Sequence, residues 1–299
     1  VGGLLGKVQD GSSFENIGAM NISVTGTGNY VGGIVGATEM SEVTGVDLSD
    51  MTVDGKGNYT GGFCGQLGYN GNSRERIITN ARITGTAVYD TDGIVTESTT
   101  TIKGNNYVGG FVGHTHQKVS NGYISSQTTP ELFVDEIVVS GLQRLGGAFG
   151  GTYTNMYHIT VQNTLVHTRD DIFKATSSYT SAGGVIGETN YSTTRAVIAD
   201  NVVVDVINTN YVGGLVGLYR YASMQHCYAM NCYISADRDS KLAETTTLSD
   251  VGGLVGLYEN TMRWNGAMNT IIDAPKHSNV GGVVGRLSQS LANNHNIDG

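Results

Sequence analysis

The sequence predicts an all-β fold, a right-handed parallel β-solenoid (β-helix) of about eight full coils with lateral loop insertions. A short glycine motif recurs nine times along the 299 residues, and the third extended segment of each repeat has its inward candidates at every second position. The right hand follows from the strong bias of parallel crossover connections.

The glycine motif sets the repeat. The first glycines of successive copies are 30, 29, 48, 37, 37, 30, 39 and 29 residues apart. A period near 30 residues with longer members is typical of a solenoid in which each repeat is one coil and each insertion a loop. The nine copies are VGGLLG at Val1, VGGIVG at Val31, TGGFCG at Thr60, VGGFVG at Val108, LGGAFG at Leu145, AGGVIG at Ala182, VGGLVG at Val212, VGGLVG at Val251 and VGGVVG at Val280.

The last glycine of the motif is present in every copy. Glycine serves where the backbone takes a positive φ or where another chain approaches closely, so we expect a corner of the coil there. The alternative, a phosphate-binding loop, would need a following Lys-Ser/Thr pair and a helix, which the nine copies lack. The positions are 6, 36, 65, 113, 150, 187, 217, 256 and 285.

Each repeat contains three extended segments. In residues 1–30 these are the motif itself, a segment around residues 14–17 and a segment over residues 21–25. The second matches residues 43–46 and 196–199. The third has two inward columns, which read Ile22, Met51, Ala81, Ile137, Thr164, Val202, Cys232, Thr270 and Val24, Val53, Ile83, Val139, Val166, Val204, Ile234, Ile272.

An Asn-Tyr pair precedes four of the motifs, at residues 29–30, 58–59, 106–107 and 210–211, and Asn279 continues the Asn column. We expect the amides to bond one another between coils and the rings of adjacent coils to stack. A sugar-binding aromatic track is the functional alternative.

The three cysteines do not form a disulfide framework. Cys64 stands where other repeats have an apolar residue, which predicts a buried substitute for valine. Cys227 and Cys232 are expected to be buried thiols, with a disulfide as the alternative.

The composition of the chain limits the classes of partner that it is expected to bind. The formal charge is −9, from 17 basic and 26 acidic residues, and no basic cluster is present, so nucleic acid is not an expected partner. No apolar run is long enough to cross a bilayer. The repeat spans residues 1–299 without a compositional break, which predicts a single domain. Because the chain begins and ends within a repeat, we expect it to be part of a longer protein.

The motif, preceded by Asn-Tyr and followed by segments such as residues 226–235, resembles the GLUG repeat of bacterial surface proteins. Such repeats occur in adhesins and in the non-catalytic region of immunoglobulin A-cleaving metallopeptidases. The resemblance covers the whole chain and is loosest at Ala148-Phe149 and in the long insertions. It implies an extracellular β-solenoid module and brings no catalytic residue with it.

We predict no catalytic, cofactor-binding or metal-binding residues, and hence no enzyme. A zinc peptidase would need His-Glu-x-x-His, which is absent. His114 and His116 are expected to be a solvated pair. The acidic residues of the insertions are expected to be solvated too, because no carboxylate array repeats along one face. They are Asp170, Asp171, Asp237, Asp239 and Glu244.

Three insertions are predicted to leave one corner of the solenoid after the third segment, at about residues 86–104, after His167 and after Ala236. A fourth, about residues 125–134, lies before that segment. Such loops form a binding face or merely shield the sheet. The outward column of the third segment reads Ser23, Thr52, Arg82, Val138, Leu165, Val203, Tyr233 and Ile271. We expect its apolar half to be covered, by the insertions after residues 168 and 236 or by a second rod.

Together these features predict a structural or adhesive module, a stalk or adhesin, of a secreted or cell-surface bacterial protein. It would bind an unidentified surface protein or glycan through its lateral loops. The alternatives are a non-catalytic accessory module of a large secreted protease and, third, a carbohydrate-active enzyme.

Overall fold

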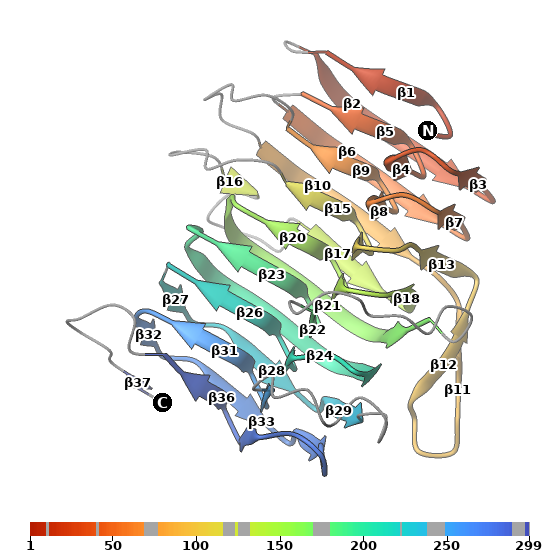
Figure 1. Ribbon diagram of the computed structural model, residues 1–299. Helices are drawn as coiled ribbons and strands as arrows, with labels where there is room; N and C mark the ends of the chain where they lie inside the picture. The colour runs from red at the N-terminus through yellow and green to blue at the C-terminus, as the bar shows by residue number, and fades with distance from the viewer. Residues whose placement is uncertain are drawn as a thin grey trace.

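The computed structural model describes residues 1–9, 12–39, 42–68, 77–115, 123–124, 132–169, 180–221, 223–237, 249–288 and 297–298. Within them the chain winds into stacked coils, and the strands of successive coils pair in parallel to form three long sheets (Figure 1). The described residues contain strands and no helix, so none of their segments is a helix long and apolar enough to span a membrane. The predicted all-β parallel β-solenoid is confirmed.

Two short sheets contain the glycine motifs, and we call them together the glycine arch. Sheet A has eight strands in the described chain and sheet B has nine, as expected for about eight coils. Sheet A consists of β4 (Tyr30–Gly32), β8 (Tyr59–Gly61), β14 (Tyr107–Gly109), β19 (Arg144–Gly146), β22 (Ser181–Gly183), β25 (Tyr211–Gly213), β30 (Asp250–Gly252) and β35 (Asn279–Gly281). Sheet B consists of β1 (Leu5–Val8), β5 (Val35–Thr38), β9 (Cys64–Leu67), β15 (Val112–Thr115), β20 (Phe149–Thr152), β23 (Ile186–Asn190), β26 (Val216–Arg220), β31 (Val255–Glu259) and β36 (Val284–Leu287).

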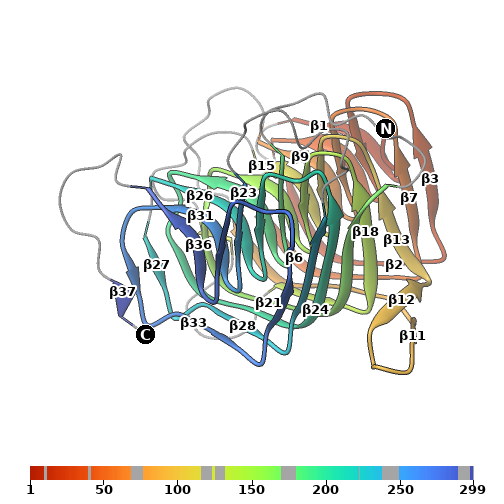
Figure 2. The ribbon, with the colours of Figure 1, turned by 60° about the horizontal axis from the view of Figure 1, so that its bottom comes forward.

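The third sheet, sheet C, closes each coil (Figure 2). Its strands in the first four coils are β2 (Ser13–Met20), β3 (Ser23–Gly26), β6 (Glu42–Ser49), β7 (Thr52–Gly55), β10 (Ile77–Thr84), β13 (Thr100–Lys103), β16 (Tyr123–Ile124), β17 (Leu132–Asp135) and β18 (Ile137–Gly141). The later ones are β21 (Asn155–Thr168), β24 (Thr194–Ile207), β27 (Met224–Gln225), β28 (Tyr228–Met230), β29 (Tyr233–Asp237), β32 (Met262–Arg263), β33 (Gly266–Met268), β34 (Ile271–Asp273) and β37 (Ile297–Asp298).

The invariant last glycine of the motif does not form a corner, and that prediction is wrong. In every copy this glycine lies inside a strand of sheet B, and none has a positive φ. The position is glycine because backbones approach closely there: a Cβ on Gly217 would lie 2.6 Å from the nitrogen of Ala182 and 2.8 Å from the oxygen of Gly187. The same kind of contact with the preceding coil recurs at the equivalent glycines from Gly36 to Gly285. The chain bends instead at the second glycine of the pair and the residue after it.

The predicted register of the third segment is wrong in one coil. The strand that continues β7 is β13, so Thr100, Thr101 and Ile102 occupy the places predicted for Ala81, Arg82 and Ile83. Those three residues lie in β10, which continues β6. With Ile102 in place, the second inward column is β-branched in every coil and buried from Val24 to Ile234.

The misplaced register also moves the first insertion. It precedes the third strand and forms an antiparallel hairpin, β11 (Ala87–Tyr89) and β12 (Val95–Ser98), that projects from the side of the rod (Figure 2). The second segment is shifted as well: through the intermediate strands Val46 aligns with Val197, so residues 43–46 correspond to residues 194–197 and not to 196–199.

One continuous apolar core runs along the rod. Cys64 pairs with Val35 and Val112 in sheet B and is buried, as predicted for a substitute for valine. Cys227 and Cys232 are free thiols in the core. Burial raises the pKa of Cys227 to about 12 and that of Cys232 to about 11, so neither is a thiolate at neutral pH.

The predicted side-chain ladders are present. The amide of Asn106 donates to Asn58 (2.5 Å) and that of Asn58 to Asn29 (3.4 Å). The Tyr30 and Tyr59 rings stack at 5.4 Å, and the Tyr59 and Tyr107 rings at 5.2 Å. Asn279 does not continue the Asn column. It pairs with Asp250 and so lies in the column of the tyrosines.

Candidate functional site

Sheet C bends twice in each coil, and the first bend opens a groove on its outer face. The residue at this bend has a left-handed backbone, which asparagine tolerates better than most residues. In six of the described coils a second left-handed residue follows five residues later and marks the next bend, at Asn21, Asp50, Asn163, Asn201, Asn231 and Asn269. The first column reads Asn16, Gly45, Asn80, His158, Ala196, His226 and Trp264, with φ between 50° and 67°. Two hollows lie along this column, one over its N-terminal members and one over its C-terminal members, and we call them together the kink groove.

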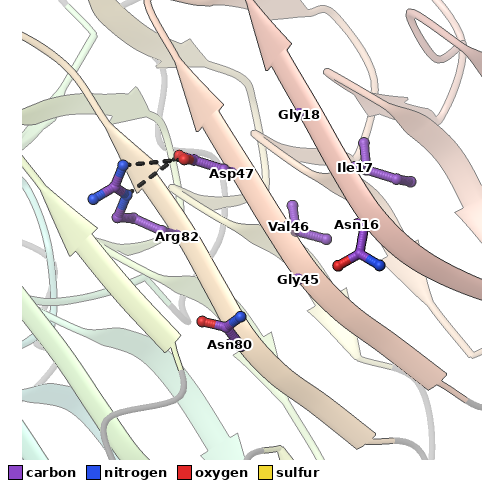
Figure 3. A pocket seen from close by; sticks show the side chains of 8 residues that line it. All are labelled: Asn16, Ile17, Gly18, Gly45, Val46, Asp47, Asn80 and Arg82. Carbon is purple, nitrogen blue, oxygen red and sulfur yellow. Dashed lines mark hydrogen bonds and ion pairs between the residues drawn. The ribbon is translucent and has the colours of Figure 1, made fainter.

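The N-terminal half of the kink groove is polar and open. A hollow of about 470 Å³ lies over Asn16, Gly45 and Asn80 (Figure 3). Arg82 forms two bonds with the Asp47 carboxylate on its rim, of 3.1 and 3.2 Å. Both side chains are more than half exposed, so this ion pair contributes under about 1 kcal/mol. A Cβ at residue 45 would lie 2.7 Å from the Asn16 side-chain oxygen. Any residue other than glycine at this position would therefore displace the Asn16 amide.

The C-terminal half carries rings and cations instead. A hollow of about 210 Å³ is lined by Tyr157, His158, Arg195, Ala196 and His226. Beyond it, the ring of Trp264 stacks on His226 with a centroid distance of 5.0 Å and an interplanar angle of 14°. Trp264, the chain's single tryptophan, is 52% exposed. A large exposed ring on a left-handed backbone is unusual for a stabilising residue and marks this half as a candidate binding site.

The second bend has a ladder of its own, which the sequence reasoning missed. Asn269 donates to Asn231 (3.2 Å) and Asn231 to Asp200 (2.8 Å). Asn201 donates to Asn163 (2.8 Å). The signal was in the sequence, because Asn recurs just before the third segment at positions 21, 163, 201, 231 and 269.

The predicted apolar column on the outer face is largely covered. Val138 and Val203 are 8% and 5% exposed, Leu165 and Tyr233 are half-buried, and Ile271 is 62% exposed. Over the first part of the column lies β12, which contacts β18 and β21. The predicted cover came from the insertions after residues 168 and 236, most of which lie outside the described residues. The cover that the structure describes is β12, over the strands of Val138 and Leu165.

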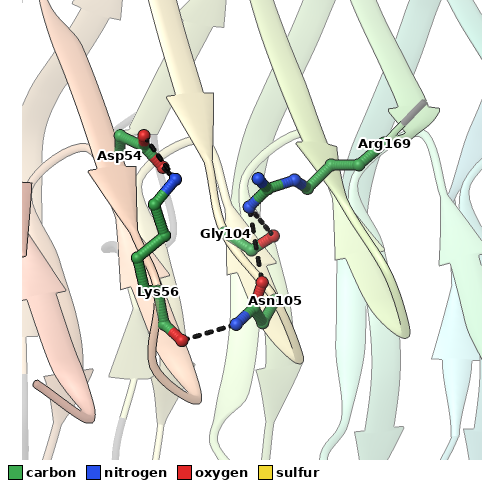
Figure 4. Close-up of polar contacts among 5 residues, drawn as sticks. All are labelled: Asp54, Lys56, Gly104, Asn105 and Arg169. Atoms are coloured by element: carbon green, nitrogen blue, oxygen red, sulfur yellow. Dashed lines mark hydrogen bonds and ion pairs between the residues drawn. The ribbon is translucent and has the colours of Figure 1, made fainter. Parts of the chain in front are cut away.

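The base of the second insertion is anchored by Arg169, which is 4% exposed. Its guanidinium reaches back across one coil and donates to the Gly104 carbonyl and the Asn105 side-chain oxygen, both at 3.3 Å (Figure 4). The Asn105 amide in turn donates to the carbonyl of Lys56, whose ammonium group pairs with Asp54 at 2.7 Å. This insertion and the one after Ala236 leave the ends of β21 and β29, as predicted.

His114 is not solvated, so that prediction is wrong. It is 4% exposed and packs against the rings of Tyr59, Tyr107 and Tyr153. Beside it Arg144 lies over the Tyr107 ring (4.7 Å) and pairs with Glu188. Because these rings are packed against one another, this part of the tyrosine ladder offers a sugar little free surface.

Of the other residues singled out in the sequence, His116, Asp170, Asp171, Asp239 and Glu244 lie outside the described residues. Asp237 is exposed and pairs with Lys276 at 2.9 Å. In the part of the chain that the structure describes, no group of three or more His, Cys, Asp or Glu side chains is placed to hold a metal ion.

No family model matches the sequence, and no curated protein matches it. Among solved structures the chain is similar to one described as a "putative immunoglobulin A1 protease" from Bacteroides ovatus. The TM-score is 0.43 with 16% identity, over 76% of this chain and 61% of that chain. At this level the likeness identifies a distant structural neighbour and supports no conclusion about activity. The GLUG resemblance stays a prediction.

Proposed function

We propose that this chain is a structural and adhesive module of a bacterial surface protein, displayed outside the cell, which binds its partner through the variable side of the rod. The observation that carries the proposal is the contrast between its two sides. The glycine arch repeats one backbone contact in every coil, which suits a rigid rod. On the side formed by sheet C the outward column of the third strand changes along the rod, from Ser23 and Thr52 to Val138 and Tyr233, and this side carries the lateral hairpin.

The lateral hairpin has a packed stem and an exposed tip. Val95 is 1% exposed, and the Tyr89 hydroxyl donates to Glu136 (2.6 Å). At the tip the Asp90 carboxylate accepts from the backbone nitrogens of Asp92 and Ile94, each at 2.9 Å. Val88, by contrast, is 53% exposed. A hairpin whose tip is held in one shape and whose first strand leaves the Val88 side chain in solvent is the form that a binding loop takes.

The proposal is tested by coating beads with the purified chain and measuring their retention on mammalian epithelial cells and on immobilised cell-surface glycans. Retention above that of uncoated beads is expected. The Val88→Ser variant and a variant in the kink groove then locate the contact. If the wild-type chain adds no retention on either surface, the adhesive role is wrong and a plain spacer remains.

We further propose that the chain catalyses no hydrolysis. Incubation with polysaccharides and immunoglobulins is expected to give no cleavage. Turnover that disappears when Asp170 and Asp171 are both replaced by Asn would contradict this. The full-length gene separates the main proposal from its alternative, because a His-Glu-x-x-His motif elsewhere in it would favour an accessory module of a secreted protease.

A further inference from the structure

The first-kink column forms a ladder of rings with one rung missing. Its last four members are His158, Ala196, His226 and Trp264, one from each successive coil. The His226 and Trp264 rings are 5.0 Å apart, close to the 5.2 and 5.4 Å of the tyrosine ladder. At Ala196 the ladder has only a methyl group, and the hollow of about 210 Å³ lies there between the two imidazoles.

The gap has the width of one ring. Successive strands are about 4.8 Å apart, so His158 and His226, two coils apart, are separated by about 9.6 Å. A ring placed midway would lie about 4.8 Å from each imidazole, the spacing of stacked rings. The hollow is smaller than the roughly 300–1,000 Å³ of pockets for drug-sized ligands, so it accommodates a single ring unit.

The rim of the gap is cationic in a chain whose formal charge is −9. Arg195 precedes Ala196, is exposed, and forms no ion pair with any described residue. Arg263 lies two coils further along the same outward column, separated from Arg195 by Gln225. Its side chain is also exposed and has no acidic partner among the described residues. The residues that line the hollow include no acid. Guanidinium groups bind carboxylates and sulfates through paired hydrogen bonds.

We propose that this gap binds one anionic sugar unit of a glycan, its ring stacked in the missing rung and its acidic group on Arg195. The inference rests on the proposed adhesive role and names the chemistry of the ligand. A glycan fits better than a peptide because the gap holds one ring and its rim carries guanidinium groups. Acidic sugars combine a ring with a carboxylate or a sulfate, which no unmodified amino-acid side chain does.

Trp264 serves as an intrinsic fluorescent probe of this site, because it is the only tryptophan of the chain and lies one rung from the gap. Its fluorescence is followed during titration with sialyllactose, a glucuronate-containing tetrasaccharide, galactose 6-sulfate and neutral lactose. Saturable changes are expected with one or more of the acidic sugars, at least tenfold tighter than with lactose. The first two probes against the third separate carboxylate from sulfate recognition.

The decisive variant is Ala196→His, which completes the ladder. The neighbouring coils already carry His at this backbone conformation, so the variant is expected to fold with an unchanged melting temperature. It should weaken acidic-sugar binding at least tenfold. Arg195→Gln copies Gln225 of the next coil and should remove the preference for acidic sugars while leaving any lactose binding unchanged. Asn80→His, at the same column in the far half, is the matched control and should bind like the wild type.

Undiminished binding by folded Ala196→His would overturn the proposal. So would the absence of saturation with all three acidic probes at 10 mM, or a fluorescence response to an aromatic peptide but to none of the sugars. Adhesion of coated beads is measured separately. If coated beads adhere but the chain binds none of the sugars, the adhesive role is supported and the glycan site is refuted.

Discussion

Gly217 in the glycine arch and Gly18 in sheet C both lie inside strands, yet their surroundings differ completely. A Cβ on Gly217 would meet three backbone atoms of the preceding coil within 2.8 Å, whereas a Cβ on Gly18 would have nothing within 4 Å. The difference teaches that the two parts of the coil are fixed by different interactions. In the arch, the short distance between backbones restricts which residues are allowed. In sheet C, the side-chain ladders and the packing of the inward columns restrict them instead.

The largest effect that this comparison predicts is for the same substitution at the two glycines. Gly217→Val should lower the free energy of unfolding by about 3 kcal/mol, the upper end of the usual cost of overpacking, because the contacted atoms are backbone and cannot turn aside. Gly18→Val should be neutral or slightly stabilising, since valine favours strands. Denaturant unfolding of both variants measures this, and equal costs at the two sites would abolish the distinction.

The second prediction concerns a polar group buried between the two regions. The Tyr219 hydroxyl, from sheet B, lies 2.8 Å from the Ser192 carbonyl and 2.7 Å from the Ser223 carbonyl, inside the core. Tyr219→Phe should lower the free energy of unfolding by about 1–2 kcal/mol, because the buried hydrogen bond that the single hydroxyl proton makes to one of these carbonyls is lost. Tyr221→Phe is the control, since Tyr221 is 39% exposed, and its unfolding should not change. A cost at Tyr221 as large as at Tyr219 would contradict burial as the cause.

A third and smaller effect is expected at the second bend of sheet C. Asn201 has a φ of 52° and donates to Asn163. Asn201→Ala should cost about 1 kcal/mol, because alanine tolerates a left-handed backbone poorly and the ladder bond is lost. Glycine tolerates the left-handed backbone but cannot form the hydrogen bond to Asn163. Asn201→Gly should therefore lower the free energy of unfolding by less than Asn201→Ala does. Thermal melts rank the two, and a greater loss for glycine than for alanine would show that the backbone conformation is not the cause.

The same contrast explains what the sequence could predict. The register of the glycine arch was predicted correctly from the nine copies of its motif. Only glycine fits the close backbone contact there, so the motif recurs at the same place in every coil. The register of sheet C failed in the third coil, where residues 77–84 and 100–103 both alternate and the hairpin separates them. The kink groove was not predicted at all. Ala196 and Trp264 have no preference for a left-handed backbone, and the preference of histidine does not single out His158 and His226 among the seven histidines. Only the alignment of these four residues with Asn16 and Asn80 in space shows their common role.

The smallest effect lies in the arch, where a charge has replaced the tyrosine of the ladder. Asp250 is 0% exposed, pairs with Arg286 at 2.9 Å and accepts from the Asn279 amide at 2.7 Å. Loss of hydration on burial outweighs both partners and raises the pKa of the Asp250 carboxyl above its usual value of 3.8. A raised pKa in the folded state means that folding favours the protonated acid. The wild type therefore loses stability as the pH rises through the folded pKa and regains it on acidification.

The Asp250→Asn variant cannot titrate at this position and serves as the reference. The stability of the wild type relative to the variant should thus increase as the pH is lowered from 7 toward 4, whatever its value at neutral pH. Urea unfolding of both chains at pH 7, 6, 5 and 4.5 gives this difference, with Arg286→Gln in the same series to remove the opposing cation. In that third chain the pKa of Asp250 should rise further and the increase should begin at a higher pH. A difference that stays constant, or that shrinks on acidification, would mean that the Arg286 ion pair outweighs the cost of burying the carboxylate.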